Sequence, residues 1–189
     1  MRRYGNKDSL GLFDDRGYQF TDVSKILLLT DTHAPRYQVP KEVWEAASTV
    51  DLILHAGDVM LGSLIDDLQA LAPVVAVAGN NDPYEVVNAW GTRAIIEAGA
   101  VRIGLVHGDR GRAASTVGRA AQAFAGLSVD VIVFGHSHMP YQKWHGSMLL
   151  VNPGSCTWPR RAPSPTFGML EITPRIKVDM LSIGEGGHV

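Results

Sequence analysis

The segment Ile26-Leu27-Leu28-Leu29-Thr30-Asp31-Thr32-His33 sets the pattern for the chain, because an apolar run ends in residues that can bind a metal. From residue 25 onward, short runs of Val, Ile and Leu alternate with segments of helical character, a rhythm typical of an α/β domain. Five further apolar runs also end in polar clusters, at Gly57-Asp58, Gly79-Asn80-Asn81-Asp82, His107-Gly108, Gly135-His136-Ser137-His138 and Asn152-Pro153-Gly154-Ser155.

Turn signals and apolar spacing predict the remaining elements. We expect helices over residues 40–50, 62–71 and 112–125. The C-terminal part has a different pattern, in which runs typical of β-strands are separated by turn residues. A hairpin around Thr173-Pro174 would close the domain with antiparallel strands.

Composition and charge exclude several classes of protein. The chain has 189 residues, 46% hydrophobic and 19% charged, which rules out disorder as its main state. Lys and Arg number 17 against 19 Asp and Glu, so no basic surplus indicates stable nucleic-acid binding. The N-terminal apolar run is far shorter than the roughly 20 residues of a membrane helix, and we expect neither a secretory nor a twin-arginine signal before it.

Domain organisation and location follow from the same features. Residues 1–24 mix basic and acidic side chains without periodicity, and we assign them to an N-terminal arm of uncertain order. Residues 25–189 are assigned to a single domain. Cys156 is the only cysteine, so an internal disulfide is excluded, and we expect a cytoplasmic protein.

The six polar clusters are expected to converge on one site. In α/β sheets the ligand crevice lies outside the carboxyl ends of the strands. Each cluster alone is more often ordinary turn or capping chemistry. Their combination favours a site, because four of the seven histidines fall in these clusters beside Asp or Asn residues of metal-ligand type.

The spacing and chemistry of these side chains indicate metal binding. Asp31 and His33 are two residues apart, as are His136 and His138, and such residues of an extended chain point to the same side. Carboxylate, amide and imidazole ligands without a thiolate suit Mn²⁺, Fe²⁺, Co²⁺ or Zn²⁺. The set is too large for one such ion with an open position, but it suits two ions that share a carboxylate.

Taken in order, these motifs resemble the calcineurin-like metallophosphoesterase superfamily, in its small prokaryotic phosphodiesterase branch. The motifs are D-x-H at Asp31, G-D at Gly57, G-N at Gly79, H-G at His107 and G-H-x-H at Gly135. Each is short, but their fixed order over one compact domain is specific. The resemblance implies an α/β (α+β) fold in which a two-sheet β-sandwich is flanked by helices and both metals lie at strand ends.

The resemblance also implies a ligand set and a reaction. One metal would be held by Asp31, His33, Asp58 and His138, and the other by Asp58, Asn80, His107 and His136, with Asp58 as the bridge. We expect two divalent metal ions, Mn²⁺ first and Fe²⁺, Zn²⁺, Co²⁺ or Ni²⁺ as alternatives. The implied enzyme is a phosphodiesterase with a metal-bridging hydroxide as nucleophile. Asp58, Asn80 and Asn81 are the candidate catalytic residues.

Asn81 departs from the family pattern. Many members read G-N-H-D here, with the His proposed to protonate the leaving oxygen, whereas this chain reads Gly79-Asn80-Asn81-Asp82. An amide cannot act as a proton-donating acid near neutral pH, although it can donate hydrogen bonds. We therefore expect a preference for good leaving groups and for diesters over monoesters.

Two alternatives share this fold. One is a catalytically weak or inactive scaffold that binds protein partners, because the fold also resembles a subunit of the eukaryotic retromer coat. The other is a phosphomonoesterase. The expected partner of the enzyme is a small phosphoester, such as a nucleotide or another phosphodiester, with no membrane and no stable nucleic-acid complex, and a homo-oligomer is allowed.

The sequence also suggests roles for individual residues near the motifs. His55 is expected to support the core or the ligands rather than to bind metal. Asp82 either orients His107 or caps the segment that follows. Trp158 could flank a substrate group, and four arginines could contact substrate phosphate or remain solvated: Arg110, Arg112, Arg160 and Arg161.

Overall fold

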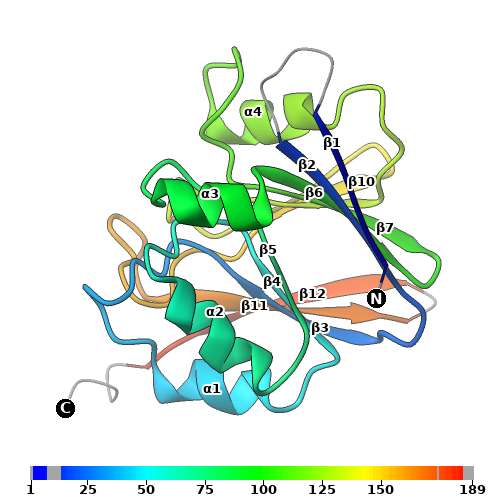
Figure 1. The fold of residues 1–189 in the computed structure, drawn as a ribbon. Helices are drawn as coiled ribbons and strands as arrows, with labels where there is room; N and C mark the ends of the chain where they lie inside the picture. The colour runs from blue at the N-terminus through cyan, green and yellow to red at the C-terminus, as the bar shows by residue number, and fades with distance from the viewer. Residues whose placement is uncertain (1, 8–13, 174, 185–189) are drawn as a thin grey trace.

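Two β-sheets form the computed structural model, which describes residues 2–7, 14–173 and 175–184 (Figure 1). In spatial order the larger sheet consists of β1 (Arg2–Lys7), β2 (Asp14–Phe20), β6 (Arg93–Ala98), β7 (Val101–Val106), β8 (Val131–Val133), β10 (Met148–Asn152) and β9 (Tyr141–His145). The smaller sheet consists of β12 (Ile176–Ser182), β11 (Thr166–Ile172), β3 (Lys25–Leu29), β4 (Leu52–His55) and β5 (Val74–Ala76). The helices are α1 (Lys41–Ala47), α2 (Gly62–Gln69), α3 (Tyr84–Trp90) and α4 (Thr116–Ala123).

Each sheet contains a block of three parallel strands. In the smaller sheet β3 pairs with β4 and β4 with β5. In the larger sheet β7 pairs with β8 and β8 with β10. Because the carboxyl ends of parallel strands share one edge, each block delivers its following loops to the same end of its sheet.

One apolar cluster fills the space between the sheets. Ile26 and Leu28 of β3 and Leu54 of β4 enter it from the smaller sheet, and Ile103 and Val131 enter it from the larger. All five side chains are fully buried. The sheets are therefore held face to face, and the two blocks of parallel strands are fixed relative to one another.

Helices cover the outer face of each sheet. Successive residues of a strand point to opposite faces, so Leu27 of β3 packs outward against Val43 of α1 and Leu68 of α2. On the larger sheet, Ile132 of β8 packs with Phe124 at the end of α4. Figure 1 shows α1 and α2 at one side of the sheets and α4 at the other. The predicted α/β sandwich flanked by helices is confirmed.

The predicted helices are found, and one further helix was missed. α1, α2 and α4 lie within the predicted segments, and each is shorter than its segment. α4 begins after Ser115, whose Oγ accepts a hydrogen bond from the N–H of Gly118 at 3.0 Å. The missed helix, α3, follows Pro83 and ends at Gly91 with φ 71°. Proline before a helix and glycine after it are the signals that could have revealed it.

Both ends of the chain add strands. β11 and β12 form the predicted antiparallel hairpin, with Ile172 opposite Ile176, while Pro174 lies outside the described residues. At the other end, β2 lies in the segment assigned to the arm, and it pairs in parallel with β6. Residues 1 and 8–13 of that arm lie outside the described residues. Within the described part of the chain, no helix is long and apolar enough to cross a bilayer.

Leu54→Ala tests the packing between the sheets. Removal of this fully buried side chain leaves a cavity and should lower the free energy of unfolding by about 2–5 kcal/mol. Leu71→Ala is the matched control, because the Leu71 side chain is 44% exposed and its loss should cost within about 0.5 kcal/mol. Urea unfolding of both variants measures the difference, and equal costs would contradict the assigned core.

Candidate metal centre

The predicted ligands lie in loops that follow parallel strands of both sheets. Asp31 follows β3, Asp58 follows β4 and His107 follows β7. Backbone hydrogen bonds join neighbouring loops: the N–H of Asp31 donates to the carbonyl of Gly57 at 2.9 Å, and the N–H of Gly135 donates to that of His107 at 3.0 Å. Across the sheets, the N–H of His136 donates to Asp31 Oδ2 at 2.9 Å, so the strand ends of the two sheets meet in one place.

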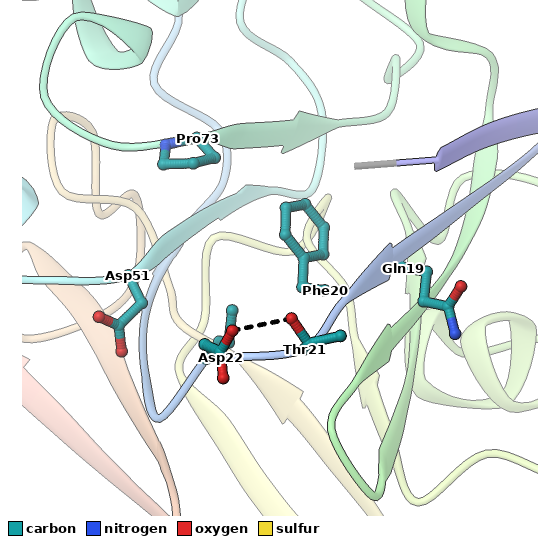
Figure 2. A pocket seen from close by; sticks show the side chains of 7 residues that line it. Gln19, Phe20, Thr21, Asp22, Asp51 and Pro73 are labelled. Atoms are coloured by element: carbon teal, nitrogen blue, oxygen red, sulfur yellow. Dashed lines mark hydrogen bonds between the residues drawn. The ribbon is translucent and has the colours of Figure 1, made fainter.

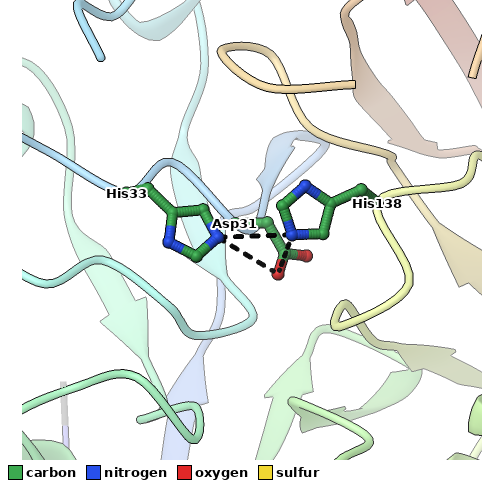
Figure 3. A group of neighbouring side chains, drawn as sticks. All are labelled: Asp31, His33 and His138. Atoms are coloured by element: carbon green, nitrogen blue, oxygen red, sulfur yellow. Dashed lines mark hydrogen bonds and ion pairs between the residues drawn. The ribbon is translucent and has the colours of Figure 1, made fainter. Parts of the chain in front are cut away.

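Asp31, His33 and His138 form the first group of potential metal ligands (Figure 3). His138 Nε2 lies 3.2 Å from Asp31 Oδ1 and 3.2 Å from His33 Nε2. The Nδ1 of His138 donates to the carbonyl oxygen of Trp158 at 2.6 Å, which leaves a lone pair on Nε2. All three side chains are buried. Electron-rich atoms thus face one another away from water, an arrangement that a cation stabilises.

Asp31, Asp58 and His107 form the second group, which is also buried. His107 Nε2 lies 3.4 Å from Asp58 Oδ2, and its Nδ1 donates to the carbonyl oxygen of Ala56 at 2.8 Å. Asp58 Oδ2 also lies 3.7 Å from His33 Nε2 in the first group. Asp58 therefore stands between the groups, and Asp31 belongs to both.

The remaining candidates border the second group on its exposed side. The His136 and His107 rings are 5.2 Å apart, and His136 Nδ1 lies 2.9 Å from Asn80 Oδ1. Asn81 donates to both oxygens of Asp58, from its backbone N–H at 2.9 Å and from Nδ2 at 2.6 Å. Asn80 and Asn81 are exposed. The structure thus brings all the sequence-predicted site residues close together.

Two unpaired buried atoms test whether this donor set fits metal ions. Four buried side-chain atoms of the described residues have no hydrogen-bond partner, and two of them, Asp31 Oδ1 and His107 Nε2, belong to candidate ligands. A buried polar atom without a partner costs about 1–3 kcal/mol, so such atoms are rare unless a ligand satisfies them. Carboxylate oxygen and imidazole nitrogen are ligands of divalent transition metals. The residues present therefore fit divalent cations.

The electrostatics of the site favour a cation. Burial alone would raise the pKa of Asp31, but the contact with His138 and the charge of His107 hold it below its ordinary value. The pKa of Asp58 is also lowered, because His107 and Asn81 outweigh the effect of burial. Burial opposes a charge on His107, but its contact with Asp58 and the charge of Asp31 raise its pKa to about 9. Both carboxylates are therefore ionised at neutral pH.

The backbone at five candidate ligands adopts the left-handed conformation. Their φ angles are 53° at Asp31, 48° at His33, 57° at Asp58, 68° at His136 and 58° at His138. A non-glycine residue in this region costs on the order of 1–3 kcal/mol and persists only where the surrounding structure holds it. Such conformations cluster at functional sites, and here they turn the ligand side chains inward from consecutive loops.

Asp82 joins two loops through backbone hydrogen bonds and does not orient the His107 ring. Its carboxylate accepts the backbone N–H groups of Asp58 at 2.8 Å, Met60 at 2.6 Å and Gly79 at 2.8 Å. Both expectations for Asp82 were therefore wrong. The His107 ring is oriented by its hydrogen bond to the carbonyl of Ala56, and α3 has no side-chain cap. The sequence could not reveal this role, because the three N–H groups come from two separate loops.

His55 supports the site without joining it, as the sequence suggested. Its ring is fully buried, with Nε2 at 3.1 Å from Thr32 Oγ1 and Nδ1 accepting the N–H of Gly57 at 3.2 Å. Burial lowers the pKa of His55 to about 4, so the ring is neutral at pH 7. Both ring nitrogens have partners, and neither is available to a metal.

The arginines divide into distinct environments. Arg110 Nε lies 3.6 Å from Asp109 Oδ2. Arg112 and Arg161 are exposed and form no ion pair within the described part of the chain. Arg160 lies against Trp158, with 4.5 Å between Cζ and the ring centroid. Arg160 therefore contacts a residue, Trp158, that touches the candidate ligand His138.

A separate surface cavity lies away from the ligands (Figure 2). Its volume is about 630 Å³, and its lining includes Phe20, Asp51 and Pro73. Asp51 and Pro73 directly precede β4 and β5, so the cavity opens at the amino ends of these strands. The candidate ligands follow the carboxyl ends, and the two places are at opposite ends of the sheet.

Comparison with known proteins identifies the family. The model of the calcineurin-like phosphoesterase superfamily domain matches residues 25–175. The chain belongs to this superfamily. The "Probable metallophosphoesterase" of Methanothermobacter thermautotrophicus is 36% identical over 166 residues, which cover 86% of this chain and 93% of the relative. The protein of the same description from Methanocaldococcus jannaschii is 33% identical over 160 residues, covering 84% and 81%.

A solved structure shares the fold of this metallophosphoesterase. Vps29 of Entamoeba histolytica, complexed with Zn²⁺, superposes with a TM-score of 0.68 at 24% identity and covers 84% of this chain and 98% of its own. This likeness concerns the fold alone. Membership of the superfamily supports a hydrolase. The family uses divalent metals, and the Asp and His groups of this chain are placed where such metals could bind.

Gly79→Ala tests how closely the metallophosphoesterase loops approach one another. A Cβ at Gly79 would lie 2.2 Å from Asp58 Oδ1, so the Asp58 carboxylate must leave its present position. We expect the variant to lose at least about tenfold in metal affinity, the effect of disturbing a residue that orients ligands. Gly62→Ala is the matched control, because a Cβ there meets nothing within 4 Å. Calorimetric titration with Mn²⁺ measures both, and an unchanged affinity in Gly79→Ala would contradict the geometry.

Proposed function

We propose that this protein is a dinuclear metal-dependent phosphodiesterase. One metal ion would be held by Asp31, His33, Asp58 and His138, and the other by Asp58, Asn80, His107 and His136. The observation that carries the proposal is the position of Asp58, whose Oδ2 lies 3.7 Å from His33 Nε2 and 3.4 Å from His107 Nε2. A carboxylate between two groups of ligands is what a shared bridging ligand requires.

The two ions would supply a water nucleophile near neutral pH and positive charge for the phosphoryl oxygens. The protein's own residues set the geometry in which this occurs. Asp58 is fixed by two hydrogen bonds from Asn81 to its carboxylate and by its backbone N–H, which donates to Asp82 at 2.8 Å. The exposed Asn80 and Asn81 mark the side from which a phosphoester could enter.

Asn81 supports a preference for diesters with good leaving groups. Its amide cannot serve as a proton-donating acid near neutral pH, and its Nδ2 is already directed at Asp58 at 2.6 Å. The leaving oxygen would then depart without a proton from this position. Such a reaction favours groups that are stable as anions, and a diester places less negative charge against the incoming nucleophile than a monoester does.

Metal identity and location complete the proposal. We favour Mn²⁺, and the Zn²⁺ in Vps29 of Entamoeba histolytica shows that a protein of this fold can hold another divalent ion. Both ions accept oxygen and nitrogen ligands. The single cysteine, Cys156, is buried and free, which suits the cytoplasmic location that we propose from the sequence.

The first test is hydrolysis of bis-p-nitrophenyl phosphate and p-nitrophenyl phosphate by chelator-treated protein, with and without added Mn²⁺. We expect turnover of the diester only with metal. Asp58→Asn should lower metal affinity by more than about 100-fold, because loss of a residue that merely orients a ligand already costs about 10–100-fold. Diester turnover should fall with it.

Asp66→Asn is the control for that experiment, since it removes an exposed carboxylate of α2 and should keep full activity. Full metal content and turnover in Asp58→Asn would contradict the ligand scheme. Folded protein that is inactive with every divalent metal would favour a scaffold that binds protein partners. Faster turnover of the monoester would favour a phosphomonoesterase.

Asn81→His tests the role of the missing acid. An imidazole at this position should raise the rate on a diester with an unactivated phenol, relative to bis-p-nitrophenyl phosphate, by at least about tenfold, because general acids contribute about 10²–10⁴-fold. Asn81→Ala is the matched control, since it removes the same hydrogen bond to Asp58 without adding an acid. An identical rate ratio in the two variants would contradict this account of Asn81.

A further inference from the structure

An aromatic pair adjoins the first group of ligands. The Trp158 ring lies edge-on to His138, with centroids 5.2 Å apart at 86°, and edge-on to His33 at 5.5 Å and 76°. Tyr37 stacks on Trp158 at 5.5 Å and 29°. The carbonyl of Trp158 also accepts the hydrogen bond from His138 Nδ1. This pair is therefore tied directly to the candidate metal centre.

Two arginines lie against the aromatic pair. Arg160 Cζ is 4.5 Å from the centroid of the Trp158 ring. Arg36 Cζ is 5.7 Å from the Trp158 centroid and 5.5 Å from that of Tyr37. Both arginines are exposed, and neither forms an ion pair in the part of the chain that the structure describes. Two positive charges beside the ligands thus have no acidic partner among those residues.

Contact with the aromatic rings restricts the motion of these guanidinium groups, which favours binding of an anion. A guanidinium packed against a ring loses freedom before any ligand arrives, while its N–H groups stay free to donate. Paired N–H donors match the oxygens of a phosphate or carboxylate. A nucleobase is a poorer candidate for this place, because the Trp158 ring already contacts Tyr37, Arg36 and Arg160.

We propose that Arg36 and Arg160 form a second anion subsite that selects substrates. The substrate would carry a further phosphate or similar anionic group besides the phosphodiester hydrolysed at the ligands. This inference rests on the proposed function and specifies its substrate class. A simple diester has one negative charge, so it leaves the two arginine charges unused, whereas a diester with an additional phosphate engages them.

The test compares two chromogenic diesters, thymidine 5′-(p-nitrophenyl phosphate) with and without a phosphate at the 3′ position. In the Mn²⁺-loaded wild-type protein, the added phosphate should raise kcat/KM at least about tenfold, mainly through KM, as expected of a charge-assisted contact. In the double variant R36Q/R160Q the ratio of the two kcat/KM values should fall close to one. Equal ratios in the wild type and the double variant would overturn the proposal.

The control is Arg161→Gln, which makes the same change of charge at the neighbouring position. Arg161 has no contact with the aromatic pair among the described residues, so Arg161→Gln should keep the wild-type ratio while Arg160→Gln lowers it. An equal fall in both single variants would show a general charge effect and overturn the assignment of the subsite.

A binding measurement separates this inference from the proposed function. Calorimetry of the Mn²⁺-loaded protein compares thymidine 3′,5′-bisphosphate with thymidine 5′-monophosphate, and the bisphosphate should bind at least about tenfold more tightly in the wild type only. If neither diester is hydrolysed, the proposed function fails, but the same preference, lost in R36Q/R160Q, still supports the anion subsite. Equal affinities for the two nucleotides in the wild type would overturn it.

Discussion

Face-to-face packing of the two sheets is the constraint on which the candidate metal centre depends. Leu28 and Leu54 of the smaller sheet share one buried cluster with Ile103 and Val131 of the larger. Burial of this apolar surface fixes the angle and offset between two blocks of parallel strands. Loops that follow β3 and β4 are then held against loops that follow β7 and β8. The ligands come from both sheets, so neither sheet could build the site alone.

The same packing sustains local arrangements that are unfavourable by themselves. Asp31, His33 and Asp58 hold left-handed backbone conformations, and Asp31 Oδ1 is buried without a partner. Each feature costs free energy that the apolar core must offset. A bound cation would recover part of that cost, because it satisfies the unpaired atoms and balances the carboxylates. We therefore expect metal binding to stabilise the fold as well as to enable the reaction.

The residues of the candidate site differ in their exposure to solvent. Asp58 and His107 lie in the interior, while Asn80 and Asn81 are exposed. Beside the first group, Trp158 connects His138 to Arg160 through its backbone carbonyl and its ring. The proposed ligands are thus buried, and the arginines that we propose to select the substrate are exposed.

The sequence alone determined the α/β class and the clusters of candidate ligands, since apolar runs such as 26–29 end in polar residues that can bind metal and strand burial is a local pattern. The two-sheet sandwich and the division of the ligands between two metals came from the resemblance to the superfamily. It could not show that Asp82 joins two loops, that α3 follows Pro83, or that Arg36 and Arg160 meet on Trp158. Only the tertiary structure decided these points. The physical reason is that each contact joins segments far apart in the chain, or outweighs a weak local preference, and distance in space is not encoded in any short stretch of residues.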